Sequence, residues 1–227
     1  MEMQLMKCVI FDCEGTLVDS EKLSCQALVS VFTDYGCSLS MDDAMSHFNG
    51  GKLVDILTQT SERLGVRVDI DALERMYRDK IQTLFQEQLS PSQNAIHVLE
   101  SLKQMGVEVC AVSNSPRTKL ESTLKISGLL PYFKGAMFSA FDANSWKPEP
   151  DLIQYAAMGM GFRSIDCLYV DDTLQGIRAG IAANITTLHY RPNPLSPQWH
   201  SEGAMSISDL RDVLQHCAKA PEIEYHI

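Results

Sequence analysis

Short apolar runs alternate along most of the chain with segments whose apolar residues recur at helical spacing. Five of these runs predict buried strands, at 8–11, 107–112, 136–138, 167–170 and 186–188. Helical periodicity predicts helices at 95–105, 116–126, 150–160, 174–183 and 207–216. Strands that alternate with helices in this way predict an α/β fold built on a doubly wound parallel sheet.

Residues 20–85 interrupt this alternation, because they carry helical periodicity and no convincing strand. The periodic segments lie at 24–32, 53–64 and 73–89, and glycines at 36, 50, 51 and 65 separate them. We therefore expect an all-helical cap domain at 19–89. It is inserted into a core domain that is made of 1–18 and 90–227.

Composition and charge narrow the classes of function. The 227 residues are 45% hydrophobic and 21% charged, which is typical of a globular protein. The net charge of −10 argues against a nucleic-acid partner and against an anionic membrane surface, and no apolar run is long enough to span a membrane. The N-terminus lacks a signal-peptide pattern, and the seven cysteines include no C-x-x-C pair. We therefore expect a cytoplasmic protein, with a monomer as the default state.

Polar side chains of particular kinds follow four of the predicted strands. The four ends carry, in order, Asp12 and Glu14, then Ser113, Asn114 and Ser115, then Trp146, Lys147 and Pro148, and finally Asp171 and Asp172. Ligands of open α/β sheets bind just beyond the carboxyl ends of the strands, and these ends meet at one edge of a parallel sheet. The sequence therefore brings two acidic pairs, a hydroxyl and amide cluster, and one lysine to the place where chemistry is usually done.

This set of side chains fits phosphoryl chemistry. A carboxylate can act as a nucleophile, and paired carboxylates offer the oxygen ligands that Mg²⁺ prefers. Lysine supplies a point charge to phosphoryl oxygens, and a serine hydroxyl near a helix start can hold them. Each feature alone has a plainer interpretation: the first acidic pair suits a turn beside Gly15, Ser113 to Ser115 suits a helix cap, and Lys147 suits an exposed loop. The combination of all four favours an active site.

The combination also resembles a known family. The segments that carry the likeness are 11–21, Val112-Ser113-Asn114, Trp146-Lys147-Pro148-Glu149-Pro150, and Val170-Asp171-Asp172-Thr173 followed by Gly176. Four motifs in this order resemble the haloacid dehalogenase superfamily, and specifically its phosphatases with a helical cap. With the cap segment 48–52 included, the chain is especially similar to the bacterial 6-phosphogluconate phosphatases and the β-phosphoglucomutase-like hydrolases of that superfamily.

The resemblance implies a role for each matching position. Asp12 would be the nucleophile that forms an aspartyl-phosphate, and residue 14 the general acid and base. Lys147 would neutralise Asp12 and the transferring phosphoryl group, which Ser113 and Asn114 would hold. The ligands of a Mg²⁺ cofactor would be Asp12, the backbone carbonyl of Glu14, Asp171 and Asp172.

The cap is expected to select the substrate, a small phosphorylated sugar or sugar acid, with 6-phosphogluconate as the best match. Asn49-Gly50-Gly51-Lys52 is the glycine-rich turn of the cap with a cation close by, so Gly50 and Lys52 are predicted to bind the substrate's non-reacting end. An ordinary connection between two helices is the alternative interpretation of this turn. The role of Arg117, on the surface or at the substrate, stays open.

Residue 14 is the one departure from the family, whose phosphatases normally carry aspartate there. The longer side chain moves the carboxyl by one methylene, and a misplacement of about 1 Å can cost on the order of 10²-fold in rate. Because of this departure, a catalytically weak protein that binds phosphosugars stays open as an alternative to a phosphatase. A sugar phosphomutase also stays open, because the mutases of this family have the same fold and nucleophile. The hexose mutases of this family carry a histidine in the first cap helix. The absence of histidine between Asp12 and His47 therefore argues against a mutase.

Overall fold

A computed structural model describes residues 6–48, 52–192 and 203–217. One sheet of six parallel strands forms its centre, in the spatial order β3-β2-β1-β4-β5-β6. The strands are β1 (Cys8–Asp12), β2 (Glu108–Ser113), β3 (Met137–Ser139), β4 (Cys167–Asp171), β5 (Thr186–Tyr190) and β6 (Met205–Ile207). The predicted α/β fold with a parallel sheet is confirmed.

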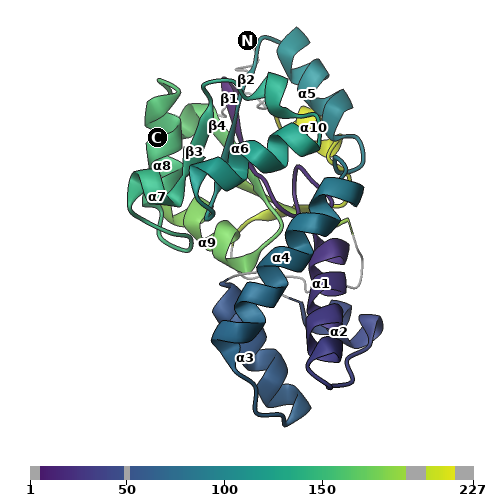
Figure 1. The fold of residues 1–227 in the computed structure, drawn as a ribbon. Helices are drawn as coiled ribbons and strands as arrows, with labels where there is room; N and C mark the ends of the chain where they lie inside the picture. Colours follow the sequence, from purple (N-terminus) through teal and green to yellow (C-terminus); the bar gives the residue numbers. More distant parts are fainter. Residues whose placement is uncertain (1–5, 49–51, 193–202, 218–227) are drawn as a thin grey trace.

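Helices cover both faces of this sheet, as Figure 1 shows. They are α5 (Ala95–Gln104), α6 (Arg117–Ile126), the single-turn α7 (Ala140–Ala143), α8 (Asp151–Gly159), α9 (Leu174–Ala182) and α10 (Asp212–Cys217), with short 3₁₀ turns at Leu130–Tyr132 and Ser164–Asp166. Because side chains alternate along a strand, β1 sends Val9 and Phe11 into one apolar cluster and Cys8 and Ile10 into the other. The first cluster includes residues of α5, α6 and α10, and the second includes residues of α8 and α9. The sheet is therefore doubly wound.

Four helices follow β1 before the chain returns to the sheet. They are α1 (Glu21–Asp34), α2 (Met41–His47), α3 (Leu53–Leu64) and α4 (Ile70–Gln88). Helix α1 packs against α2 and α4, and α3 packs against α4, so that these helices form a group below the sheet in the view of Figure 1. Phe32, Leu57 and Leu73 are buried within this group. Its helices lie where helical periodicity predicted the inserted cap, and the boundaries 19–89 remain our proposal for its extent.

The structure differs from the predicted elements at two places. The helix expected at 207–216 is wrong in its first part, because Ile207 ends the edge strand β6 and α10 begins only at Asp212. A three-residue strand is too short to show an alternating pattern, and its pairing with β5 decides its conformation. Helix α2 was not predicted, although Ser40 caps it by accepting a hydrogen bond of 3.1 Å from the Asp43 amide.

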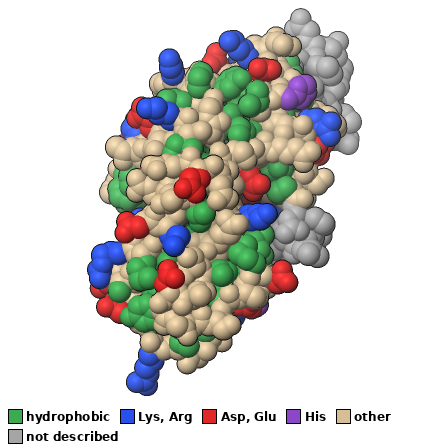
Figure 2. Space-filling model, turned by 45° about the vertical axis from the view of Figure 1, so that its right-hand side comes forward, with side chains coloured by type: hydrophobic (Ala, Val, Ile, Leu, Met, Phe, Trp, Pro, Cys, Tyr) green, Lys and Arg blue, Asp and Glu red, His purple; other side chains and the backbone are tan. Residues whose placement is uncertain are grey.

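The surface carries charged side chains of both signs, as the composition leads one to expect. Figure 2 shows lysine and arginine side chains interspersed with aspartate and glutamate on the face in view. Among the described residues, no helix is both long and apolar enough to cross a membrane.

Candidate active site

The carboxyl ends of β1, β2 and β4 meet at one edge of the sheet. Strand β1 lies between β2 and β4, and the register pairs Asp12 with Val112 and Phe11 with Val170. As a result, Asp12, Ser113 and Asp171 each end a strand at the same level. The prediction that these strand ends converge is confirmed.

Lys147 links two of these strand ends. Its ammonium group is buried and contacts the Asp12 carboxylate, and it lies 2.8 Å from Asp171 Oδ2. The side chain of Asn114 holds the backbone of Lys147: its Oδ1 accepts a bond of 2.9 Å from the Lys147 amide, and its Nδ2 donates one of 3.4 Å to the Lys147 carbonyl. Asn114 therefore fixes the lysine that reaches the central aspartate.

Burial and charge shift the pKa of both partners. Burial raises the pKa of Asp12 to about 7, with Lys147 opposing the rise and Asp171 adding to it. Burial alone would lower the pKa of Lys147, but the carboxylates of Asp12 and Asp171 outweigh it and raise that pKa above its ordinary value. The lysine is thus a cation beside a carboxyl whose ionised form burial disfavours and Lys147 partly restores.

Three carboxylates gather beside this lysine. Asp12, Asp171 and Asp172 each offer an oxygen atom, and these atoms lie within 4.8 Å of one another. Burial and the carboxylates of Asp171 and Asp12 raise the pKa of Asp172 well above its ordinary value. An all-oxygen donor set under mutual repulsion suits a hard divalent cation such as Mg²⁺, so the residues present fit the cofactor that the family implies.

Hydroxyl groups orient two of these carboxylates. Thr173 donates to Asp171 Oδ1 from both its amide and its hydroxyl, each at 2.7 Å, and the buried Tyr169 hydroxyl donates to Oδ2. Thr16 Oγ1 donates to Asp172 Oδ1 at 2.9 Å. The carboxylates are therefore held in place by the protein itself.

Two glycines allow the carboxylates to approach the backbone. A Cβ on Gly15, whose φ is +91°, would lie 2.2 Å from Asp172 Oδ2. A Cβ on Gly176 would lie 1.9 Å from Asp171 Oδ2. Any larger residue at either position would displace an acidic side chain of the cluster.

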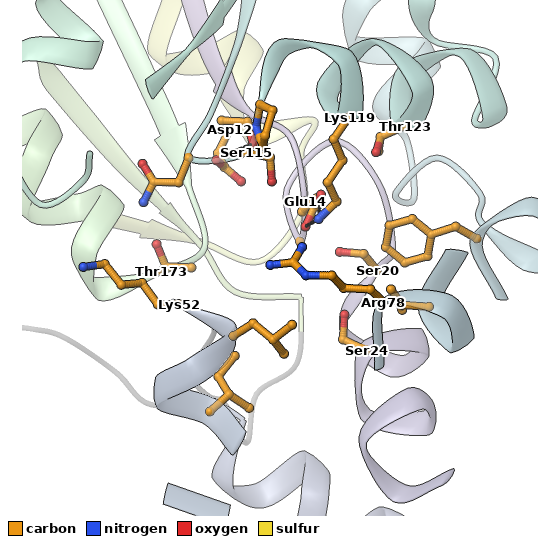
Figure 3. Close-up of a pocket in the computed structure, with 18 of the residues that line it drawn as sticks. Asp12, Glu14, Ser20, Ser24, Lys52, Arg78, Ser115, Lys119, Thr123 and Thr173 are labelled. Carbon is orange, nitrogen blue, oxygen red and sulfur yellow. Dashed lines mark hydrogen bonds and ion pairs between the residues drawn. The ribbon is translucent and has the colours of Figure 1, made fainter. Parts of the chain in front are cut away.

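A cleft of about 1030 Å³ opens over these groups and extends to the helices that follow β1. Asp12, Asn114 and Lys147 line its sheet side. Lys52, directly before α3, and Arg78 on α4 line the opposite side, and both are exposed (Figure 3). Arg78 forms an ion pair with Glu74 one helical turn away.

Glu14 also lines the cleft, where it meets a residue that the sequence did not single out. The Lys119 ammonium, on the first turn of α6, lies 2.9 Å from Glu14 Oε1 and 3.3 Å from Oε2 (Figure 3). The contact joins residues that are 105 positions apart, so no local spacing pattern could reveal it.

The other predicted residues lie as follows. The buried Ser113 faces the cleft, and its hydroxyl accepts a bond of 3.0 Å from the Ser115 amide. Arg117 does not line the cleft: it donates to the Met137 carbonyl at 3.0 Å and pairs with Asp142. Gly50 lies outside the described residues.

Residues 9–190 match the family model of the haloacid dehalogenase-like hydrolases, a range that runs from the second residue of β1 to the end of β5 and contains the helices inserted after β1. The chain belongs to this family, as its motifs predicted. Within the family it is a phosphoric monoester hydrolase, that is, a phosphatase.

The chain is similar to one named relative and to solved structures. The chain is 32% identical over 192 residues to the 6-phosphogluconate phosphatase of Escherichia coli K12, and the match covers 85% of this chain and 86% of that protein. A haloacid dehalogenase-like protein of unknown function from Agrobacterium tumefaciens superposes with a TM-score of 0.81 at 25% identity, over 92% of this chain and 96% of the other. A candidate β-phosphoglucomutase from Thermotoga maritima shares the fold, with a TM-score of 0.77 at 20% identity over 93% and 99% of the two chains.

Proposed function

We propose that this enzyme is a Mg²⁺-dependent phosphatase that hydrolyses a small phosphorylated sugar or sugar acid through an aspartyl-phosphate. The observation that carries the proposal is the buried Lys147 between Asp12 and Asp171, next to a cluster of three carboxylates at the base of a large cleft. Asp12, the Glu14 carbonyl, Asp171 and Asp172 would hold the ion. When bound, Mg²⁺ supplies positive charge that offsets the charge of the phosphoryl oxygens.

The residues of the chain divide the reaction into two steps. In the first, an Asp12 oxygen bonds to phosphorus while the bond from phosphorus to the sugar oxygen breaks, and Glu14 gives its proton to the departing alkoxide. In the second, Glu14 takes a proton from water, whose oxygen attacks phosphorus and releases inorganic phosphate and free Asp12. Lys147 would favour the ionised form of Asp12 for attack, and the Ser113 hydroxyl would donate to a phosphoryl oxygen.

Two observations support an anionic sugar derivative as the substrate. The relative that is 32% identical is named as a 6-phosphogluconate phosphatase, which makes 6-phosphogluconate the first candidate. Lys52 lines the cleft and makes no ion pair with the residues that the structure describes, whereas Arg78 and Lys119 each pair with a glutamate. We infer that Lys52 binds the substrate's carboxylate end.

The structure offers less support for a phosphomutase. No histidine among the described residues lines the cleft, and His47 on α2 is exposed and contacts Asp43 and Ser46. The histidine that the hexose mutases of this family carry in the first cap helix therefore has no counterpart among the described residues that line the cleft.

The test is phosphate release from a panel of phosphorylated metabolites, with Mg²⁺ and with excess chelator. The panel contains 6-phosphogluconate, glucose 6-phosphate, phosphoglycolate and an aryl phosphate. We expect release with Mg²⁺ only, no turnover by Asp12→Asn, and a higher Mg²⁺ requirement for Asp172→Ala. Full activity in chelator would remove the metal from the mechanism, and an active Asp12→Asn variant would show that Asp12 is not the nucleophile. Interconversion of sugar phosphates without phosphate release would indicate a mutase, and binding without turnover a phosphosugar-binding protein.

A further inference from the structure

We propose that Lys119 is a positioning residue that fixes the carboxylate of Glu14, and that it acts through Glu14 and not on the substrate. The inference rests on the proposed function, in which Glu14 transfers protons. It gives a role to the ion pair between Glu14 and Lys119, and it explains how a glutamate can serve at this position.

The geometry of the pair defines an orientation. The Lys119 ammonium lies within hydrogen-bond reach of both Glu14 oxygens, at 2.9 and 3.3 Å. Both side chains are partly exposed in the cleft, at 31% for Glu14 and 42% for Lys119. A contact of this exposure adds little to the free energy of folding, so its consequence is mainly geometric.

The lysine comes from a helix that is firmly anchored. Leu120 and Leu124 of α6 are buried in the apolar core. At the first turn of the helix, Arg117 donates to the Met137 carbonyl of β3 and pairs with Asp142 of α7. The start of α6 is thus held to two neighbouring elements, and Lys119 extends from a fixed position.

Glutamate needs such a partner more than aspartate would. Its side chain has one more rotatable bond, which lets the carboxylate sweep a larger volume at the end of β1. Displacing a reacting group by about 1 Å can lower a rate on the order of 10²-fold. A cation that contacts both oxygens selects one of these positions, and Lys119 contacts Glu14 from the wall of the cleft.

The test is a double-mutant cycle of Lys119→Met and Glu14→Gln, measured with a sugar phosphate whose alkoxide leaving group needs a proton. We expect Lys119→Met to lower kcat by about 10-fold to 100-fold and to leave KM within about twofold. In the Glu14→Gln background, Lys119→Met should change neither constant by more than about twofold. Lys119→Arg should restore most of kcat, and Lys125→Met, on the last turn of α6, is the matched control that removes a charge from the same helix.

Each other outcome contradicts the proposal. Equal effects of Lys119→Met in both backgrounds would show that Lys119 acts independently of Glu14, and a raised KM with unchanged kcat would place it at the substrate. Unchanged kinetics of Lys119→Met would remove the role altogether. An inactive wild-type enzyme would instead refute the proposed function, and crystal structures of the wild type and of Lys119→Met would then test the pair. We expect the Glu14 carboxylate to leave its position when Lys119 is replaced, and an unchanged Glu14 side chain in the variant would contradict the positioning role.

Discussion

Lys147 balances the charge of the site at the scale of single residues. It is buried between two carboxylates, so its single positive charge offsets part of their negative charge inside the protein, where solvent does not reach. Asp12, Lys147, Asp171 and Asp172 were all predictable, because their residue types stand out at the ends of apolar strands. The contact of Lys119 with Glu14 was not, because an exposed lysine on a helix carries no signal of a partner more than a hundred positions away.

Replacement of Lys147 tests this charge balance. Lys147→Met keeps the length of the side chain but leaves Asp12 and Asp171 buried together without their cation. We expect phosphatase activity to be lost and the free energy of unfolding to fall by about 3–5 kcal/mol in chelator. Urea denaturation measures the change, with Lys125→Met as the exposed control. A stability within about 1 kcal/mol of the wild type would show that the carboxylates do not depend on Lys147.

Secondary-structure elements were predictable where their pattern was long enough. Strands β1, β2 and β4 are apolar runs that end in polar or acidic residues, and the apolar residues of helices α3 and α4 recur at helical spacing. Strand β6 and helix α2 were missed because one is very short and the other has few buried residues, which leaves tertiary contacts to decide their structure. Contacts between distant elements could not be predicted either, because they depend on the tertiary fold. Thr16 and Asp172, for example, are hydrogen-bonded although they are 156 positions apart.

One contact between elements predicts a pH dependence of stability. Asp209, ahead of α10, accepts hydrogen bonds from Arg211 and from Asn94 at the start of α5. The bonds from Arg211 are the main cause that lowers the pKa of Asp209 from 3.8 to about 2. A lowered pKa stabilises the folded state when the pH is above the pKa of the carboxyl in the unfolded chain, which is near 4. This stabilisation is lost as the pH falls through the folded-state pKa of about 2.

Asp209→Asn should therefore lower the free energy of unfolding by about 1 kcal/mol at pH 7, a value reduced for solvent screening at this partly exposed site. The difference from the wild type should shrink steadily below pH 4. Urea denaturation of the two proteins at several pH values measures it. A difference that stays constant from pH 7 to pH 3 would assign the effect to the amide substitution and not to the charge.

At the scale of the whole molecule, the cleft lies between the sheet and the helices that follow β1. The sheet supplies the acidic cluster and Lys147, and the helices after β1 supply Lys52 and Arg78 on the far side of the cleft. We expect this arrangement to hold a small substrate from both sides, and we propose that the helical side selects its non-reacting end. The sequence predicted this division, but the volume of the cleft and the cations facing it depend on how the helices pack.

Lys52→Ala tests whether the helical side of the cleft recognises the substrate. We expect KM for 6-phosphogluconate to rise by about 10-fold with kcat little changed, because the lost contact is equally present in the ground state and the transition state. KM for glucose 6-phosphate, which lacks the carboxylate, should change less. Lys22→Ala on α1, outside the cleft, is the matched control. Equal changes for the two substrates would separate Lys52 from carboxylate recognition.

The position of β1 has a consequence for how the protein is made. This apolar strand lies between β2 and β4, yet the ribosome produces it before all of α1 to α4 and before either neighbour. During synthesis the strand must wait with its backbone unpaired while contiguous helices gain their local contacts. The strand that ends in Asp12 is therefore exposed to aggregation in the nascent chain, and conditions that slow translation after residue 88 should increase the dependence of the protein on chaperones.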